Sequence, residues 1–180
     1  MLFPTLQTKR LLLREIEDSD LSKVFEGLSD PKVVKHYGVS FTSLEATREQ
    51  MDWYSNMMKN DTGRCWAICV SESNEFAGVI TLPFWEKQHR KAELGYWLLP
   101  AYWRNGYATE AAAAVINYAF REMKLHRIKA ETEDDNPGSI ATLKKLGFVY
   151  EGTQKECGIK NGRFLNLDIY ALLNNKGDFF

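Results

Sequence analysis

The order of apolar patterns along this chain predicts an α/β fold of the α+β kind, in which helices cover both faces of a mixed, mostly antiparallel central sheet of about seven strands. Short apolar or alternating runs, typical of strands, are interleaved with longer segments whose apolar residues recur every three to four positions, as in helices. Some strand-like runs follow one another without a helix between them, which indicates antiparallel neighbours. The expected order of elements is β-α-α-β-β-β-α-β-α-β-β.

The first half of the chain is expected to hold one strand, two helices and the antiparallel run. Lys9–Glu15 is short and rich in apolar residues, as a strand is. Asp18 or Ser19 can cap the first helix, which Asp30-Pro31 ends, and Ser43 can cap the second. The strands of the antiparallel run are Cys65–Val70, Phe76–Leu82 and Ala92–Leu99.

The second half begins with a long helix and ends with a hairpin. Apolar residues step by four from Tyr107 to Met123, which predicts one helical stripe. Apolar and polar residues then alternate over 128–132, as in a strand. The pair Asn161-Gly162 is favoured in type I′ turns, so it predicts the final hairpin.

A short helix is expected between that strand and the hairpin. Asn136 can cap it and Pro137 can open it. Gly147 is expected to close it in the left-handed conformation, which would fold Phe148 back onto Leu143 in a Schellman motif.

Composition places the chain among ordinary globular proteins. It has 23 Lys+Arg against 24 Asp+Glu, so its charge gives no reason to expect nucleic acid or an anionic membrane as a partner. With 44% hydrophobic residues, a chain of 180 residues can bury roughly 70% of its unfolded surface. We expect a single domain over residues 1–180, with its core from about Thr8 to Leu173 and a short C-terminal tail.

The sequence suggests neither a membrane span nor a secretion signal. Leu94–Trp103, among the longest charge-free stretches, is about half of the roughly 20 residues that cross a bilayer. The basic pair Lys9-Arg10 follows the apolar N-terminal piece, which is the reverse of a signal peptide. We therefore expect a cytoplasmic protein.

Cysteines and histidines suggest neither a disulfide framework nor a metal site. No C-x-x-C motif occurs, and all the cysteines are expected to be core thiols: Cys65, Cys69 and Cys157. The histidines are far apart, without the spacing of metal ligands: His36, His89 and His126. No bound metal is expected.

The turn after the third strand of the run is suited to bind a phosphate. The first amides of a helix lack internal acceptors and lie at the positive end of its dipole. Gly106 and Ala108 leave the backbone accessible there, and Arg104 adds a positive charge. The alternative is that the glycine only turns the chain and Arg104 points to water.

Asn136-Pro137-Gly138-Ser139 is a second candidate. It opens the next helix, and it is expected beside the first turn across adjacent strands. The Asn136 side chain can both donate to and accept from the amides of an extended ligand. The alternative is a plain helix cap.

Four motifs follow one another in this region: Leu98-x-Pro100, Asn105-Gly106-Tyr107-Ala108-Thr109-Glu110-Ala111, Asn136-x-x-Ser139 and Lys145-Leu146-Gly147-Phe148. Together they resemble the acetyl-CoA-binding core of the GNAT acyltransferase superfamily. Further motifs are Thr8-Lys9-Arg10-Leu11-x-Leu13-Arg14, Gly95-Tyr96-Trp97-Leu98, Glu151-Gly152, Lys155-Glu156 and Asp168-x-Tyr170-x-Leu172-Leu173. With them the chain resembles, more narrowly, the RimJ/RimL-type ribosomal-protein N-terminal acetyltransferases. The resemblance covers nearly all of the chain, and it is specific through the order and spacing of its motifs.

The resemblance implies a binding site for acetyl-CoA as cosubstrate. The Leu98 backbone would bind the acetyl or pantetheine amides, and Asn136 the pantetheine arm. The pyrophosphate would lie on backbone amides of Arg104, Asn105, Gly106, Tyr107, Ala108 and Thr109. The superfamily's usual Gln or Arg at the start of this turn is Trp103 here, and its usual following Gly is Arg104.

The resemblance also suggests catalytic residues. The tyrosine that many GNAT enzymes place seven residues beyond this Asn is Leu143 here, which removes the usual general acid. Ser139 resembles the residue proposed for that role in RimL-type enzymes, although it can equally only position the sulfur. Glu93, on the strand that leads into the cofactor site, is the candidate base; its alternative is an exposed residue paired with Arg90 or Lys91.

The expected reaction is direct acetyl transfer to a primary amine, most favourably the N-terminal α-amine of a ribosomal or other protein. At pH 7 an α-amine costs about 1.2 kcal/mol to deprotonate, against about 4.6 for a lysine side chain. The acceptor groove is expected between the segments Lys35–Phe41, Phe84–Arg90 and Gln154–Phe164.

Two other functions remain open at this stage. One is acetylation of a polyamine or another small amine, which acidic residues in the groove would favour. The other is a non-catalytic acetyl-CoA-binding or interaction module. The final hairpin can also leave an edge that pairs with a second copy, so a homodimer is open.

Overall fold

The structure, a computed structural model, describes residues 3–174 of the chain. The predicted C-terminal tail lies outside these residues, except for Asn174. The described helices include none that is both long and apolar enough to cross a membrane.

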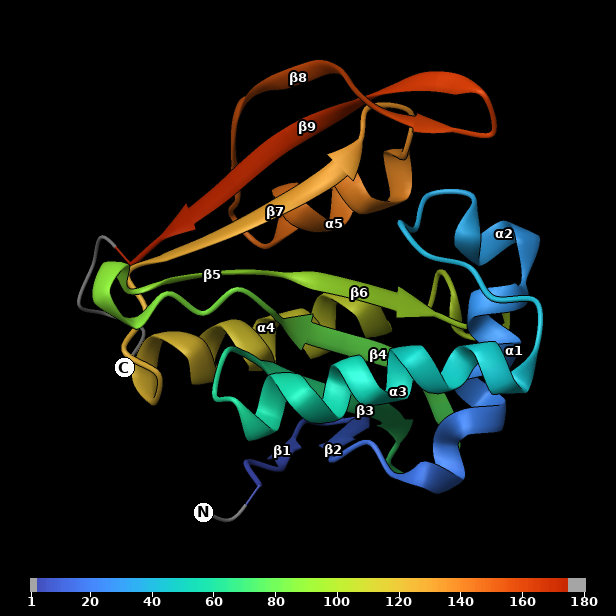
Figure 1. The fold of residues 1–180 in the computed structure, drawn as a ribbon. Helices are drawn as coiled ribbons and strands as arrows, with labels where there is room; N and C mark the ends of the chain where they lie inside the picture. The colour runs from blue at the N-terminus through green and yellow to red at the C-terminus, as the bar shows by residue number, and fades with distance from the viewer. Residues whose placement is uncertain (1–2, 175–180) are drawn as a thin grey trace.

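The described strands form two sheets (Figure 1). The first sheet is antiparallel, and its strands in spatial order are β1 (Leu6–Gln7), β2 (Leu11–Arg14), β3 (Arg64–Val70), β4 (Phe76–Leu82) and β6 (Gly95–Leu98). The second sheet has the order β5 (Lys91–Glu93), β7 (Arg127–Glu133), β9 (Arg163–Leu173) and β8 (Val149–Lys160). Only the β5–β7 pair is parallel. The prediction of a mostly antiparallel α+β fold is therefore confirmed.

Helices cover both faces of the first sheet, as predicted. On one face lie α1 (Leu21–Ser29), the short α2 (Pro31–Val34) and α3 (Leu44–Lys59), whose buried residues share a core with Trp97 of β6. On the other face lies α4 (Tyr107–Arg121), whose buried residues share a core with Leu98. The helix α5 (Pro137–Lys145) packs against α4 and against β7 of the second sheet, and it contributes Leu143 to the same core. The strand β6 is thus buried between two layers of helices.

One predicted strand is divided in two. The sequence predicts a continuous strand over Ala92–Leu99, but the chain changes partner at Leu94. The Leu94 amide donates to the carbonyl of Lys129 (2.7 Å), after which Gly95 pairs with Thr81 of β4. As a result β5 belongs to the second sheet and β6 to the first, and the ladder between this strand and β7 ends at Leu94.

Several local predictions are confirmed. The Ser43 hydroxyl accepts from the Ala46 amide and caps α3 (3.1 Å). Gly147 has a φ of 86°, and the Phe148 amide donates to the Leu143 carbonyl (3.0 Å), as a Schellman motif requires. 

The prediction for the cysteines is wrong at one of three positions. Cys65 and Cys69 are buried on β3, but Cys157 is exposed. It lies on β8, the outer strand of the second sheet, where no element of the described chain covers it.

Candidate functional site

The turn between β6 and α4 presents free backbone amides. Gly106 precedes the helix with a φ of 77°, and no side chain caps α4. Within the described chain, the amides of residues 104–109 have no hydrogen-bond acceptor, and the first bond into the helix is from the Glu110 amide to Gly106. Arg104 has a φ of 62° and an exposed side chain, which explains why glycine is usual at this position. The structure therefore supplies the helix N-terminus that the sequence predicts.

The N-terminal segment braces this turn. The Arg10 guanidinium donates to the carbonyl of Asn105 (2.9 Å) and pairs with Glu110 (2.7 Å), and it lies over the ring of Tyr107. Glu110 also accepts from the Thr8 hydroxyl (2.7 Å). Burial acts to raise the pKa of Glu110, but the hydrogen bonds from Thr8 and Arg10 outweigh it and lower the pKa. Glu110 is thus a neutralised anion beside the free amides.

The carbonyl of Leu98 already has one partner. Leu98 lies near the end of β6, and its carbonyl oxygen accepts from the Trp103 indole nitrogen (2.7 Å). The bond closes the turn back on its strand. Trp103, which stands where the superfamily usually has Gln or Arg, therefore contacts the Leu98 carbonyl. The resemblance implies that the Leu98 backbone also binds the acetyl or pantetheine amides of the cofactor.

Asn136 is a helix cap, and it brings Ser139 into the site region. Its side-chain oxygen accepts from the Ser139 amide (3.1 Å), so the cap interpretation holds structurally. Its amide nitrogen has no acceptor in the described part of the chain. Both residues lie at the N-terminus of α5, while Leu143 is buried in the core and cannot supply a proton donor.

Tyr96 is a site residue that the sequence analysis missed. Its hydroxyl lies 3.4 Å from the Ser139 hydroxyl, so it connects β6 to α5. Burial raises the pKa of Tyr96 against the opposing effect of hydrogen bonds with Ser139 and Thr142, and the phenol stays protonated. The signal was present, because alternation along β6 puts Tyr96 on the same face as Leu94 and Leu98.

Glu93 is half-buried and paired, but not with the expected residues. Its carboxylate contacts Lys129 of β7 (2.9 Å), and Lys129 also contacts Glu131 (2.7 Å). The alternative pairing with Arg90 or Lys91 is wrong: Lys91 pairs with Glu86, and Arg90 donates to the carbonyl of Lys124. Burial raises the pKa of Glu93 and outweighs the effect of Lys129.

A row of charged side chains lines one face of β7. Ile128, Ala130 and Thr132 are buried, so the alternating residues Lys129, Glu131 and Glu133 share the opposite face. Glu93 joins this row through Lys129. Arg127 shares this face of β7 but pairs with Glu151 of β8, so the three carboxylates of Glu93, Glu131 and Glu133 are paired, among lysines of the described chain, with Lys129 and Lys160.

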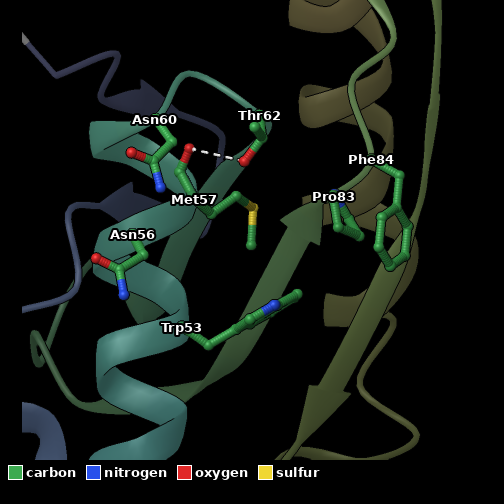
Figure 2. A pocket seen from close by; sticks show the side chains of 7 residues that line it. All are labelled: Trp53, Asn56, Met57, Asn60, Thr62, Pro83 and Phe84. Atoms are coloured by element: carbon green, nitrogen blue, oxygen red, sulfur yellow. Dashed lines mark hydrogen bonds between the residues drawn. The ribbon is translucent and has the colours of Figure 1, made fainter.

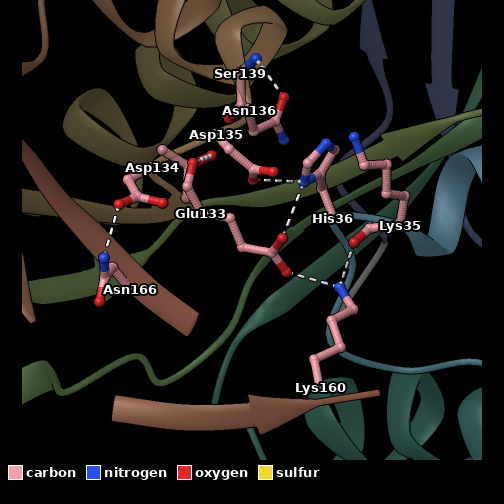
Figure 3. Close-up of polar contacts among 10 residues, drawn as sticks. Lys35, His36, Glu133, Asp134, Asp135, Asn136, Ser139, Lys160 and Asn166 are labelled. Carbon is pink, nitrogen blue, oxygen red and sulfur yellow. Dashed lines mark hydrogen bonds and ion pairs between the residues drawn. The ribbon is translucent and has the colours of Figure 1, made fainter. Parts of the chain in front are cut away.

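The far end of the row is a cluster drawn from distant segments (Figure 3). Glu133 accepts from His36 (2.9 Å) and pairs with Lys160 (2.7 Å), and Asp135 lies 3.4 Å from His36. His36, Glu133 and Asp135 thus offer potential metal-ligand atoms within 4.8 Å of one another, which sequence spacing did not reveal. Lys160 already neutralises Glu133 there.

Two of the predicted groove segments meet. The Lys160 ammonium donates to the Lys35 carbonyl (2.6 Å), so the Gln154–Phe164 hairpin contacts the Lys35–Phe41 segment. The Phe84–Arg90 segment borders a separate hollow, in which Trp53 and Met57 of α3 face Pro83 and Phe84 (Figure 2). This hollow adjoins Glu93, whose amide donates to the Pro83 carbonyl (3.0 Å).

Comparisons with known proteins agree with this geometry. A family model described as Acetyltransferase (GNAT) domain matches residues 10–149. A relative from Bacillus subtilis, the uncharacterized N-acetyltransferase YoaA, is 32% identical over 96% of this chain and 98% of its own length.

Solved structures extend the likeness to the whole fold. Spermidine N-acetyltransferase from Vibrio cholerae, in complex with CoA and spermine, has a TM-score of 0.84 at 22% identity, covering 94% of this chain and 98% of its own. RimL, a ribosomal L7/L12 α-N-protein acetyltransferase in complex with CoA, also has a TM-score of 0.84, at 23% identity and with the same coverage of 94% and 98%. From the matching family model and the full-length relative, the chain belongs to the GNAT family of N-acetyltransferases.

Proposed function

We propose that the chain, acting as one catalytic domain, transfers the acetyl group of acetyl-CoA to the N-terminal α-amine of a protein. The observation that carries the proposal is the set of free amides at the N-terminus of α4, beside a strand that ends at Leu98. That RimL and the spermidine enzyme, of the same fold, bind CoA supports it.

The residues of the turn fit a diphosphate. The amides of Arg104, Asn105, Gly106, Tyr107, Ala108 and Thr109 would donate to its oxygens at the positive end of the helix dipole. Arg10 cancels the charge of Glu110, which would otherwise repel an anion. The free lone pair of the Leu98 carbonyl and the free amide nitrogen of Asn136 would hold the pantetheine arm.

Two residues from different elements would act as the acid–base groups, Glu93 on β5 and Ser139 on α5. Acetyl-CoA supplies an activated acetyl thioester. Glu93 would take the proton of the attacking amine, directly or through a water. Ser139, oriented by the Asn136 cap and the Tyr96 hydroxyl, would donate a hydrogen bond toward the sulfur. Because a thiol with a pKa of roughly 8.5 leaves readily, orientation of amine and thioester supplies most of the acceleration.

A second acceptor class, polyamines, is favoured by a specific observation. The face of β7 that bears Lys129 also presents Glu131 and Glu133, next to Glu93 on β5. Carboxylates on this face would bind the ammonium groups of an aliphatic polyamine. 

A single assay separates the acceptors. Release of free CoA from acetyl-CoA would be measured with peptides bearing a free N-terminus, with the same peptides N-terminally blocked, with polyamines and with amine antibiotics. Turnover of free but not blocked peptides supports the protein acceptor. Turnover confined to polyamines supports the second class, and tight acetyl-CoA binding without turnover of any amine indicates a binding module.

The direct contribution of Arg104 to cofactor binding can be tested with one variant. If the guanidinium contacts a phosphate, Arg104→Ala weakens acetyl-CoA binding about tenfold at low salt and less at high salt, because salt screens the charge. Calorimetry at two salt concentrations measures both values. Affinity that is unchanged at both would leave the binding to backbone amides alone.

A further inference from the structure

The outer end of the β8–β9 hairpin extends past the sheet that supports its base. Pairing of β9 with β7 ends where Leu167 faces Glu133. Asn166 still contacts Asp134, and the strand residues closer to the tip pair within the hairpin. Figure 1 shows this end reaching beyond β7 toward α2. Ile159 and Phe164, which face each other near the tip, are 69% and 66% exposed, so these two side chains are not packed into the core.

Lys160 connects this hairpin end to the body of the protein. Its ammonium donates to Glu133 (2.7 Å) and to the Lys35 carbonyl (2.6 Å), and it joins segments that are far apart in the sequence (Figure 3). The side chain of Lys160 is 26% exposed and that of Glu133 is 15% exposed. The Asn166 side-chain amide donates to the Asp134 carboxylate (2.9 Å), at a point farther from the tip of the hairpin.

The Lys160–Glu133 pair is charged and only partly hydrated. Burial acts to raise the pKa of Glu133, but the hydrogen bonds from Lys160 and His36 outweigh it and hold the pKa below its usual value. Glu133 is therefore a carboxylate whose oxygens are both in use. Removing the ammonium would leave one oxygen poorly solvated, so an incoming ammonium group would be bound in its place.

The Lys160–Glu133 pair lies on the same side of the sheet as Glu93, the candidate base that would receive the proton of the acceptor amine. Glu133 lies on the same face of β7 as Lys129, which contacts Glu93. Lys129 and Glu133 are four positions apart on the strand, a distance of about 13 Å. An extended acceptor whose reacting amine lies near Glu93 could thus place a second cationic group at Glu133.

We propose that Lys160 is a displaceable latch that holds the β8–β9 hairpin end against Glu133 and Lys35, and that a second alkylammonium group of the acceptor replaces it at Glu133. The identity of the displacing group rests on the proposed function, since it is part of an acceptor amine. The latch itself does not depend on turnover. Lys160 and Glu133 then help determine which acceptors enter.

Hydrogen–deuterium exchange of the full chain tests the latch without any substrate. In Lys160→Met, amides of residues 155–166 are expected to exchange about tenfold faster than in the unmodified protein, because a partly buried charged bond is lost. Lys155→Met, on the same hairpin but without an ion pair in the described chain, is the matched control and should leave exchange unchanged. Lys160→Arg should restore slow exchange. Equal exchange in Lys160→Met and the unmodified protein would overturn the latch.

The displacement is tested by adding amines to the same measurement. Spermidine should accelerate exchange of residues 155–166 in the unmodified protein, whereas butylamine, with one ammonium group, should not. A peptide with a free N-terminus and a nearby lysine also carries two ammonium groups, so it tests whether a protein acceptor displaces Lys160. Glu133→Gln should abolish the response, and Asp135→Asn, which alters a neighbouring carboxylate that does not contact Lys160, should retain it. A hairpin that responds to neither spermidine nor the peptide contradicts displacement, even if acetyl transfer is observed.

Discussion

At the scale of single residues, Glu93 and Lys129 show how one ion pair can set the protonation of a candidate base. Burial raises the pKa of Glu93, Lys129 opposes that rise, and the nearby charge of Glu131 adds to it. Lys129 lies between the two carboxylates and contacts both, so it stabilises the ionised form of Glu93. Lys129 is therefore expected to position Glu93 and to keep it ionised, and so available as a base, at lower pH than burial alone would allow.

Replacing Lys129 should move the pH profile in a defined direction. Without the ammonium the pKa of Glu93 rises further, so in Lys129→Met the acid limb of kcat/KM shifts to higher pH, and the loss of rate is largest on the acid side. The measurement is kcat/KM against pH. Lys91→Met, which removes the partner of Glu86 instead, should keep the profile of the unmodified enzyme.

Glu93→Gln completes this test, since it removes the proton acceptor while keeping the shape of the side chain. A general base typically accelerates a reaction by about a hundredfold or more, so a fall of at least about a hundredfold is expected in kcat. If the rate and its pH dependence are both unaltered by Glu93→Gln, the amine loses its proton to another group or to solvent.

At the scale of elements, the bracing of α4 links the N-terminal segment to the candidate cofactor turn. Glu110 is held by Thr8 and Arg10, which lie immediately before β2. The folded-state pKa of Glu110 lies below its ordinary value, so the stability it contributes is present above the unfolded-state pKa of about 4.3 and is lost as the pH falls through the folded-state pKa.

Glu110→Gln should therefore destabilise the protein in a pH-dependent way. We expect a loss of about 1 kcal/mol in the free energy of unfolding at pH 7, a modest value because Arg10 is 43% exposed. The difference should shrink at acid pH. Urea unfolding at both pH values measures it, with Glu49→Gln on the exposed side of α3 as the control. An equal loss at both pH values would mean that packing, not charge, is responsible.

At the scale of the whole molecule, the site lies where the two sheets diverge. The turn that precedes α4 follows a strand of the first sheet, whereas Asn136 follows a strand of the second. A ligand that contacts both would bind the folded chain only. A homodimer paired through β8, the outer strand of the second sheet, stays a prediction.

Acetyl-CoA should accordingly stabilise the entire fold. At a concentration one hundred times its Kd, a ligand specific for the native state adds about 2.7 kcal/mol, which for a chain of this size raises Tm by roughly 5–10 °C. Thermal unfolding with and without ligand measures the shift. Acetyl-pantetheine, which lacks the diphosphate, should give a smaller shift at the same concentration. The absence of any shift at millimolar acetyl-CoA would contradict the proposed cofactor site.

Much of the fold could be predicted because its signals are local. Ser43, Asn136 and Gly147 act within one helical turn of their own positions, and apolar periodicity identified the helices. The free amides before α4 could be predicted for the same reason, since the N-terminus of a helix depends on a few adjacent residues. The resemblance then supplied what local patterns do not, namely which ligand such a turn would hold.

The sequence by itself therefore determined the order of the long helices and of most strands, the caps at Ser43, Asn136 and Gly147, and the candidate cofactor turn. The expected cap of the first helix at Asp18 or Ser19 is wrong, because these residues form a short 3-10 helix before α1. Only the tertiary structure decided that the strand at Leu94 divides between two sheets, that Tyr96 meets Ser139, and that Lys160 closes over Glu133. The physical reason is the separation in sequence between the residues that interact. Caps and periodic patterns are set by neighbours in the chain, whereas these contacts join segments that come together only when the packing of both sheets is complete.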